Sequence, residues 1–190
     1  MWLTLLTGCI PVLHSPDGGA AATSDYVKPE NAWPAAESVP PLEGAGFEVG
    51  EVVPHESLLD QNGDTTDLWQ FYGDVWVLDV STIWCGPCQA MASTLQETAD
   101  AYKDEGFVYV TILRQDLDGE VPEQDDLQYW VDSWEIVDQP VLSDASGFTD
   151  AITGGTTFPA LLVVNRDLTV ASRVTVPDDA LLVEAIEAAL

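Results

Sequence analysis

Apolar positions along the chain fall into short continuous runs and into stripes at helical spacing, and the two kinds alternate. Runs that are almost wholly apolar are typical of strands buried on both faces. They predict strands at 75–80, 107–113, 141–143 and 160–164. Stripes of apolar residues three or four positions apart predict helices after Cys85, over 127–134 and from about 177 onwards. Strands that alternate with helices indicate an α/β fold.

Turn signals add outer strands to this sheet. Asn62-Gly63 lies inside 58–66 and predicts a β-hairpin ahead of the central strands. A turn at 165–167 leads into a further strand at 170–176. This last hairpin makes the predicted central sheet mixed.

Composition divides the chain into three parts. Residues 10–43 are rich in Pro, Ala, Gly and Ser without sustained periodicity, which predicts a flexible tether. The predicted folded unit spans 44–190, the length of a typical single domain. Residues 1–9 have the character of a short or atypical signal segment.

The charge balance narrows the possible partners. Five basic residues against 33 acidic ones give a net charge of −28 over 190 residues. So few cations exclude generic nucleic-acid binding and electrostatic docking on anionic lipid. The excess favours a solvated acidic surface suited to salty surroundings over a dedicated site for a basic partner.

Cys85 and Cys88 form a C-x-x-C pair between a predicted strand and the helix that follows it. A cysteine at a helix N-terminus faces unpaired N–H groups and the positive end of the helix dipole, and both favour the thiolate. The second cysteine follows about one turn later, within reach of a disulfide. The pair therefore predicts an attacking thiol, Cys85, and a resolving thiol, Cys88.

Other uses of the pair have weaker support. A structural zinc site needs four ligands, and only Cys9, His14 and His55 remain as cysteines or histidines. Haem attachment needs a histidine where Gln89 stands. A purely structural disulfide would close too short a loop to constrain the unfolded chain much. A carrier of a soft ion such as Cu(I) stays open as an alternative.

The stretch Trp84 to Cys88 matches the redox motif of the thioredoxin superfamily residue for residue. The stretch 59–63 resembles the TlpA-like and peroxiredoxin-like branch, the redoxin-type thiol-disulfide oxidoreductases. So do three residues ahead of the central strand, namely Leu68, Phe71 and Gly73. The likeness covers roughly 44–190. It implies a thioredoxin-like fold with a mixed sheet, flanking helices, an N-terminal hairpin extension and an inserted helix.

The resemblance implies roles for individual positions. Cys85 would attack and Cys88 would resolve, and Asp79 would move the proton of the resolving thiol. Phe158-Pro159 resembles the cis-proline position of the family, so Pro159 would lie against the cysteine pair. The alternatives are an aspartate that reaches solvent at a strand end and an ordinary trans proline that opens a strand. No metal or cofactor beyond the disulfide is implied.

The resemblance also implies a substrate-binding surface formed by Trp84, Gly86, Pro87 and Phe158. Phe158 is bulkier than the usual family residue at its position, which bears on substrate choice. Gln89 replaces a basic residue common in the family, so one source of thiolate stabilisation is missing.

The segment 115–138 matches the insertion of the TlpA-like branch in position. It carries Tyr129, Trp130 and Trp134, and a stripe that includes both tryptophans predicts a helix with a large aromatic face. We expect these aromatic side chains to belong to the core.

Leu6-Thr7-Gly8-Cys9 resembles the lipobox of bacterial lipoproteins, in which the cysteine is lipidated after cleavage. The basic start and the longer apolar stretch of a working signal are missing from residues 1–9. The resemblance implies a periplasm-facing protein of the bacterial cell envelope that touches the membrane only through a lipid on Cys9.

The expected function is reduction of disulfides in envelope proteins by a monomer. Protein thiols and disulfides would be its partners, together with a membrane thiol protein that donates electrons. A thiol peroxidase is the alternative enzyme, because Thr82 precedes Cys85 as in the peroxiredoxin pattern. Leu78 stands where that pattern has a proline. The copper carrier is the alternative outside enzymes.

Overall fold

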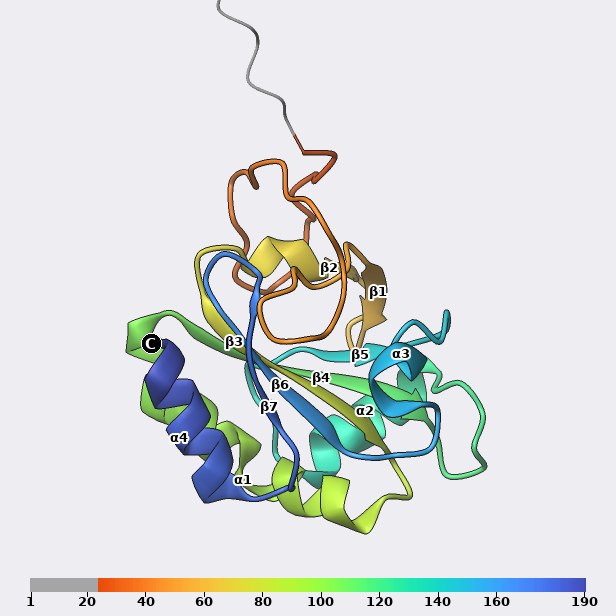
Figure 1. The fold of residues 1–190 in the computed structure, drawn as a ribbon. Helices are drawn as coiled ribbons and strands as arrows, with labels where there is room; N and C mark the ends of the chain where they lie inside the picture. The colour runs from red at the N-terminus through yellow and green to blue at the C-terminus, as the bar shows by residue number, and fades with distance from the viewer. Residues whose placement is uncertain (1–23) are drawn as a thin grey trace, which may run out of the picture.

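The computed structural model describes residues 24–190, which fold around one mixed seven-stranded sheet (Figure 1). The strands lie in the order β2-β1-β5-β4-β3-β6-β7. β3, β4 and β5 run parallel, whereas β1 and β6 run antiparallel to their neighbours. The mixed sheet of an α/β fold is therefore confirmed. The bounds are Ser57–Asp60 (β1), Thr65–Asp67 (β2), Val75–Thr82 (β3), Phe107–Gln115 (β4), Val141–Ser143 (β5), Ala160–Val164 (β6) and Val170–Val174 (β7).

Helices and turns cover both faces of the sheet. One face packs against three helices, which are α1 (Gly86–Tyr102), α2 (Gln124–Ser133) and α4 (Asp179–Ala189). The other face packs against the 3-10 turn η1 (Leu68–Phe71), the short helix α3 (Asp150–Thr153) and the N-terminal segment. A second 3-10 turn, η2 (Lys103–Glu105), follows α1 and ends at Gly106 in the left-handed conformation.

The central strand β3 is buried along its whole length, which explains its continuous apolar run. Successive side chains point to opposite faces of a sheet. Trp76 and Leu78 therefore belong to one core cluster, and Val75 and Val77 belong to the other. Asp79 interrupts the apolar pattern on the face that α1 covers. The carboxyl end of this strand leads directly into the candidate site.

Most predicted elements occur where the pattern places them. β6 has the predicted bounds, and the predicted hairpin forms β1 and β2 with Asn62 and Gly63 between them. The inserted helix is α2. Trp130 on this helix is buried in the core, as expected, whereas Tyr129 is exposed.

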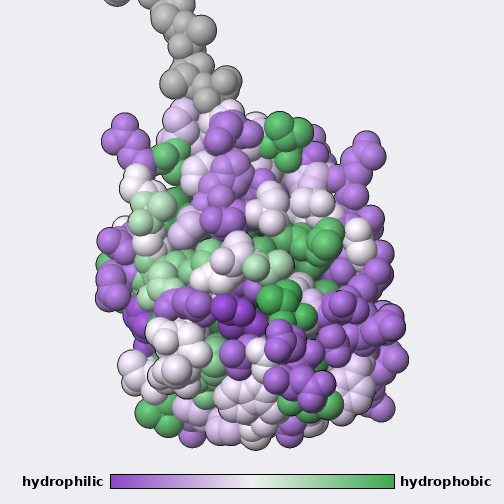
Figure 2. Space-filling model, turned by 90° about the vertical axis from the view of Figure 1, so that its right-hand side faces the viewer, coloured by the Kyte–Doolittle hydropathy of each residue, from purple (hydrophilic) through white to green (hydrophobic). Residues whose placement is uncertain are grey.

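The surface agrees with the charge balance. Figure 2 shows one side of the domain, where hydrophilic side chains surround a band of apolar ones. All five basic side chains have partners. Four of them contact carboxylates, namely Lys28, Lys103, Arg114 and Arg173. The fifth, Arg166, donates to backbone carbonyls. Because 33 acidic residues share these few cations, most carboxylates face water.

Residues 24–43 correct the prediction of a flexible tether over 10–43. They contain no helix or strand, yet Val39 is buried in the core and Tyr26, Trp33 and Leu42 pack against it. Residues 10–23 of the predicted tether lie outside the described residues, as does Cys9. Composition misled the prediction because a few large side chains attach this segment without any periodic pattern.

Two buried polar side chains of the domain depend on this segment. Asn31 Nδ2 donates to the Gln70 Oε1 atom at 2.9 Å, and Gln70 Nε2 donates to the Pro34 carbonyl at 2.9 Å. Trp33 Nε1 donates to the Asp60 Oδ2 atom at 2.6 Å. Gln70 and Asp60 are both fully buried. A buried polar group without a partner is costly, so these bonds attach the segment to the domain.

We predict that Trp33→Phe lowers the free energy of unfolding by about 1–3 kcal/mol, because it leaves an oxygen of buried Asp60 without its indole donor. Equilibrium urea denaturation measures the change. Trp84→Phe is the matched control, since its indole bond to Gln115 is exposed. We expect the control to lose less than about 1 kcal/mol. Equal small losses in both variants would show that residues 24–43 do not stabilise the domain.

Candidate active site

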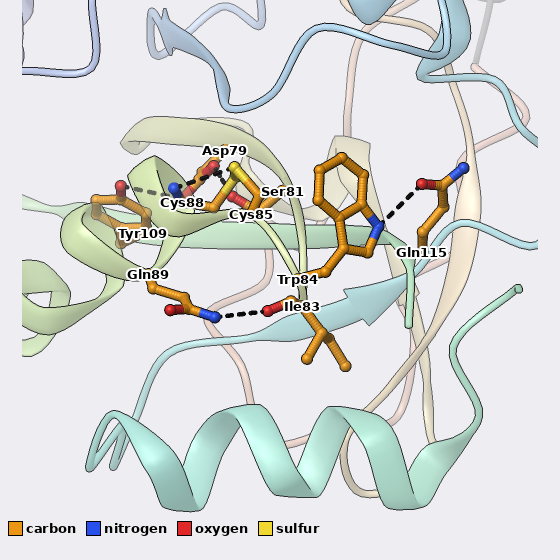
Figure 3. Close-up of a disulfide and its surroundings, with 9 residues drawn as sticks. All are labelled: Asp79, Ser81, Ile83, Trp84, Cys85, Cys88, Gln89, Tyr109 and Gln115. Atoms are coloured by element: carbon orange, nitrogen blue, oxygen red, sulfur yellow. Dashed lines mark hydrogen bonds between the residues drawn. A yellow bond between two sulfur atoms is a disulfide. The ribbon is translucent and has the colours of Figure 1, made fainter. Parts of the chain in front are cut away.

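Cys85 and Cys88 lie where β3 passes into α1 and form a disulfide with a Cα–Cα distance of 5.2 Å (Figure 3). Cys85 is the N-cap residue, and its Sγ accepts the Cys88 N–H at 3.2 Å. Pro87 occupies the first turn of α1, where its missing N–H has no helical partner to lose.

The two sulfurs differ in their surroundings. Cys85 is 4% exposed and Cys88 is fully buried, whereas Gly86 and Pro87 between them are exposed. A Cβ added at Gly86 would meet no other atom of the chain within 4 Å. The chain therefore leaves open space at Gly86, next to Cys85, which is the more exposed of the two cysteines.

The helix N-terminus supplies the electrostatic support for a thiolate at Cys85. The Cys88 N–H bonds its sulfur, and the free N–H groups and positive dipole end of a helix N-terminus favour a negative charge at this position. Gln89 stands where the family often has a basic residue, and its Nε2 donates to the Ile83 carbonyl at 2.8 Å. This amide therefore holds the chain ahead of the cysteines and adds no charge.

Asp79 is fully buried on the face of β3 that α1 covers. Burial raises the pKa of this carboxyl from 3.8 to about 7, although hydrogen bonds from Ser81 and Tyr109 lower it. The alternative of an aspartate that reaches solvent is therefore wrong. A carboxyl with a pKa near neutrality is suited to proton exchange.

Trp84 and Phe158 form an aromatic pair next to the disulfide. Trp84 is 47% exposed, and its Nε1 donates to the Gln115 Oε1 atom at 3.1 Å (Figure 3). The rings of Trp84 and Phe158 meet edge to face with centroids 6.0 Å apart. The indole is thus held in one orientation while a large part of it stays open to solvent.

The Phe158–Pro159 peptide bond is cis, as the family resemblance predicts. Pro159 immediately precedes β6, which pairs with β3. A cavity of about 190 Å³ adjoins this proline and extends toward β7, with Ile152, Leu162 and Arg173 among its lining residues. This geometry leaves space beside the cis-proline.

Among residues 24–190, no three His, Cys, Asp or Glu side chains form a group that could hold a metal ion. The same part of the chain has no helix of the length and apolarity that a membrane span requires.

Comparison with known families now identifies the chain. Residues 49–173, more than half of the sequence, match the AhpC/TSA family. The chain belongs to the AhpC/TSA family. A search of curated proteins finds no significant match to it.

Solved structures share the fold of this AhpC/TSA protein. A thiol:disulfide interchange protein of the thioredoxin family from Chlorobium tepidum is 16% identical to this chain, with a TM-score of 0.61. The match covers 78% of this chain and 99% of the Chlorobium protein. The thioredoxin domain of a thiol-disulfide oxidoreductase from Bacteroides vulgatus is 18% identical, with a TM-score of 0.61. The match covers 76% of this chain and 100% of the Bacteroides structure. A secreted disulfide oxidoreductase from Mycobacterium tuberculosis is 22% identical, with a TM-score of 0.58. The match covers 70% of this chain and 96% of the Mycobacterium structure. The thioredoxin-like fold is therefore confirmed.

Three residues that the sequence analysis missed contact the predicted site, namely Ser81, Tyr109 and Gln115. Ser81 could have been found, because it lies two residues after Asp79 and shares its face of the strand. The other two lie on β4, and only the register between β3 and β4 brings them to the site.

We predict that Asp79→Asn stabilises the AhpC/TSA domain at alkaline pH and much less at acid pH. The folded carboxyl has a pKa of about 7 against 3.8 as a model value, so the wild type loses stability as pH rises between these values. Asparagine stays neutral and avoids this loss. The expected gain in the free energy of unfolding is on the order of 4 kcal/mol at pH 8.5, measured by urea denaturation of the oxidised protein.

Asp138→Asn is the control for that experiment. A hydrogen bond from Gln96 lowers the pKa of the exposed Asp138 carboxyl, so neutralising it should give no gain at alkaline pH. A gain from Asp79→Asn of equal size at pH 4 and pH 8.5 would contradict the assignment of the effect to a buried charge.

Proposed function

We propose that this AhpC/TSA protein is a thiol-disulfide oxidoreductase that uses the Trp84–Cys88 motif to reduce disulfides of other proteins. The observation that carries the proposal is the Cys85–Cys88 disulfide at the N-terminus of α1, with a buried carboxyl on the adjoining strand. The names of the three structural neighbours described above refer to disulfide chemistry, which supports the same assignment.

The reaction starts from the reduced pair. The Cys85 thiolate attacks one sulfur of a substrate disulfide and forms a mixed disulfide, and the other substrate sulfur leaves as a thiolate. Cys88 then gives its proton to Asp79 and attacks the Cys85 sulfur. The Cys85–Cys88 bond forms as the bond to the substrate breaks, and each released thiolate takes up a proton. The substrate gains two electrons and two protons, and the enzyme loses them.

The residues around the pair suit the docking of an extended chain. Gly86 and Pro87 leave the approach to Cys85 open, while Trp84 and Phe158 offer an apolar wall beside it. Backbone next to Pro159 can pair with a bound strand, because an extended peptide adds readily to exposed backbone groups. In this proposal Phe158 narrows the range of side chains that fit.

Disulfide exchange explains the pair better than the two alternatives. A thiol peroxidase needs one attacking cysteine, and here the second cysteine lies in the first turn of the same helix, bonded to the first. A Cu(I) carrier would use the same two sulfurs as ligands. Consumption of hydrogen peroxide by the reduced protein and binding of Cu(I) distinguish these functions from disulfide reduction.

A reducing role needs a source of electrons. Gly86 and Pro87 between the cysteines resemble the reducing members of the superfamily, so we place the protein downstream of a membrane thiol donor. Equilibration in thiol buffers tests the direction. A potential near about −270 mV supports a reductant, and one near about −120 mV would instead indicate an oxidant.

We also propose that the protein works as a monomer on the periplasmic side of a bacterial envelope, attached by a lipid on Cys9. The resemblance of Leu6 to Cys9 to a lipobox supports the anchor. The Mycobacterium tuberculosis neighbour is described as a secreted protein, which is consistent with an exported protein here.

We predict that Cys85→Ser abolishes disulfide reductase turnover and that Cys88→Ser accumulates mixed disulfides with substrates. The second variant can attack but cannot resolve, so its adducts survive until a thiol is added. Non-reducing electrophoresis and mass spectrometry of cell envelopes identify them. Cys85→Ser/Cys88→Ser is the control. Absence of adducts from Cys88→Ser, at normal expression, would overturn the proposed mechanism.

For the anchor, we predict that cells expressing the full chain incorporate labelled palmitate and that Cys9→Ala does not. Cys88→Ala is the control, because it retains Cys9 and should incorporate the label like the wild type. An unlabelled wild-type protein would remove the lipid anchor from the proposal.

A further inference from the structure

The buried carboxyl of Asp79 has no cationic partner in the part of the chain that the structure describes. Its side chain is fully buried, and no ion pair among residues 24–190 includes it. A carboxylate withdrawn from water is costly unless hydrogen-bond donors replace the lost solvent. The groups that supply these donors therefore influence when the carboxyl takes up or releases a proton.

Two hydroxyl groups supply the donors, one to each carboxyl oxygen. Ser81 Oγ donates to the Asp79 Oδ1 atom at 2.6 Å, and Tyr109 OH donates to the Asp79 Oδ2 atom at 3.3 Å. Ser81 comes from β3 itself and Tyr109 from the neighbouring strand β4. Figure 3 shows both side chains directed at Asp79 in the surroundings of the disulfide.

The other elements on this face add few ionisable groups. β6 and α4 contribute apolar side chains to the same core, among them Leu161 and Leu182. α1 contributes the cysteines, of which Cys88 is fully buried. Asp179 at the start of α4 raises the pKa of Tyr109, after the larger effects of burial and Asp79 itself. Tyr109 therefore stays protonated and remains a donor.

We propose that Ser81 and Tyr109 are positioning residues that hold the Asp79 carboxyl in the orientation from which it exchanges a proton with Cys88. The inference rests on the proposed function, because it concerns the step in which Cys88 resolves the mixed disulfide. A hydroxyl can donate to the carboxylate and, after rotation, accept from the carboxylic acid. Two hydroxyls can thus hold Asp79 in both states, and they favour its charged form less strongly than a fixed cation would.

Titration of Asp79 in the oxidised protein tests the positioning directly, because disulfide-bonded cysteines do not titrate. The probe is the carboxyl carbon resonance of labelled aspartate, assigned by its loss in Asp79→Asn. Ser81→Ala and Tyr109→Phe each remove a donor to the charged form. Each should raise the titration midpoint of Asp79 by about half to one pH unit.

Two further variants separate positioning from general disturbance. Ser81→Thr retains the hydroxyl and should restore the wild-type midpoint. Tyr102→Phe removes a tyrosine hydroxyl that bonds Glu187 at the surface, and should leave the midpoint unchanged. If Tyr109→Phe does not fold, the Ser81 pair of variants decides the question alone.

The rate of resolution connects the positioning to the reaction. Rapid mixing of the reduced protein with a small disulfide should give a rate of resolution that rises with pH, with its midpoint displaced upward in Ser81→Ala and Tyr109→Phe. Unmoved midpoints in both the titration and the rate profile would overturn the inference while the proposed function stands. A wild type that does not reduce the disulfide, despite a displaced Asp79 midpoint in the variants, would overturn the proposed function.

Discussion

Burial of a carboxyl in the central strand is the constraint on which the rest of the site depends. Asp79 stands in a strand that is covered on both faces, and within residues 24–190 two hydroxyl groups are the only hydrogen-bond donors to its carboxyl. A pKa of about 7 places this group between its two protonation states at neutral pH. The chain accepts a cost in stability here, and carboxyls with pKa values raised in this way are frequent at functional sites.

The position of the cysteines follows from the same strand. β3 ends at Thr82, and α1 must start close by if it is to turn back and cover the face that carries Asp79. The first turn of α1 therefore has to lie at the carboxyl end of the sheet. This brings Cys85 to the helix N-terminus, where the backbone itself favours a thiolate. Covering the buried face of β3 with α1 thus also places Cys85 at the helix N-terminus.

Sequence pattern predicted the elements well because most of them bury a periodic apolar face. A short apolar run such as 160–164, with turns at both ends, is typical of a strand, and the motif from Trp84 to Cys88 pointed to the thioredoxin-like fold. The pattern could not supply the pairing of β3 with β4, which brings Tyr109 to Asp79. It also failed for residues 24–43, where isolated contacts such as Trp33 with Asp60 replace periodicity.

The packing of residues 24–43 against the core shortens the part of the chain that could link the domain to an anchor. These residues pack around η1, which precedes β3, whereas the disulfide lies where β3 ends (Figure 1). If Cys9 carries the proposed lipid, the 14 residues from 10 to 23 limit the distance between anchor and domain to about 50 Å. The reach of such an anchored domain would therefore be set by these 14 residues alone, because residues 24–43 are already spent on packing against the core.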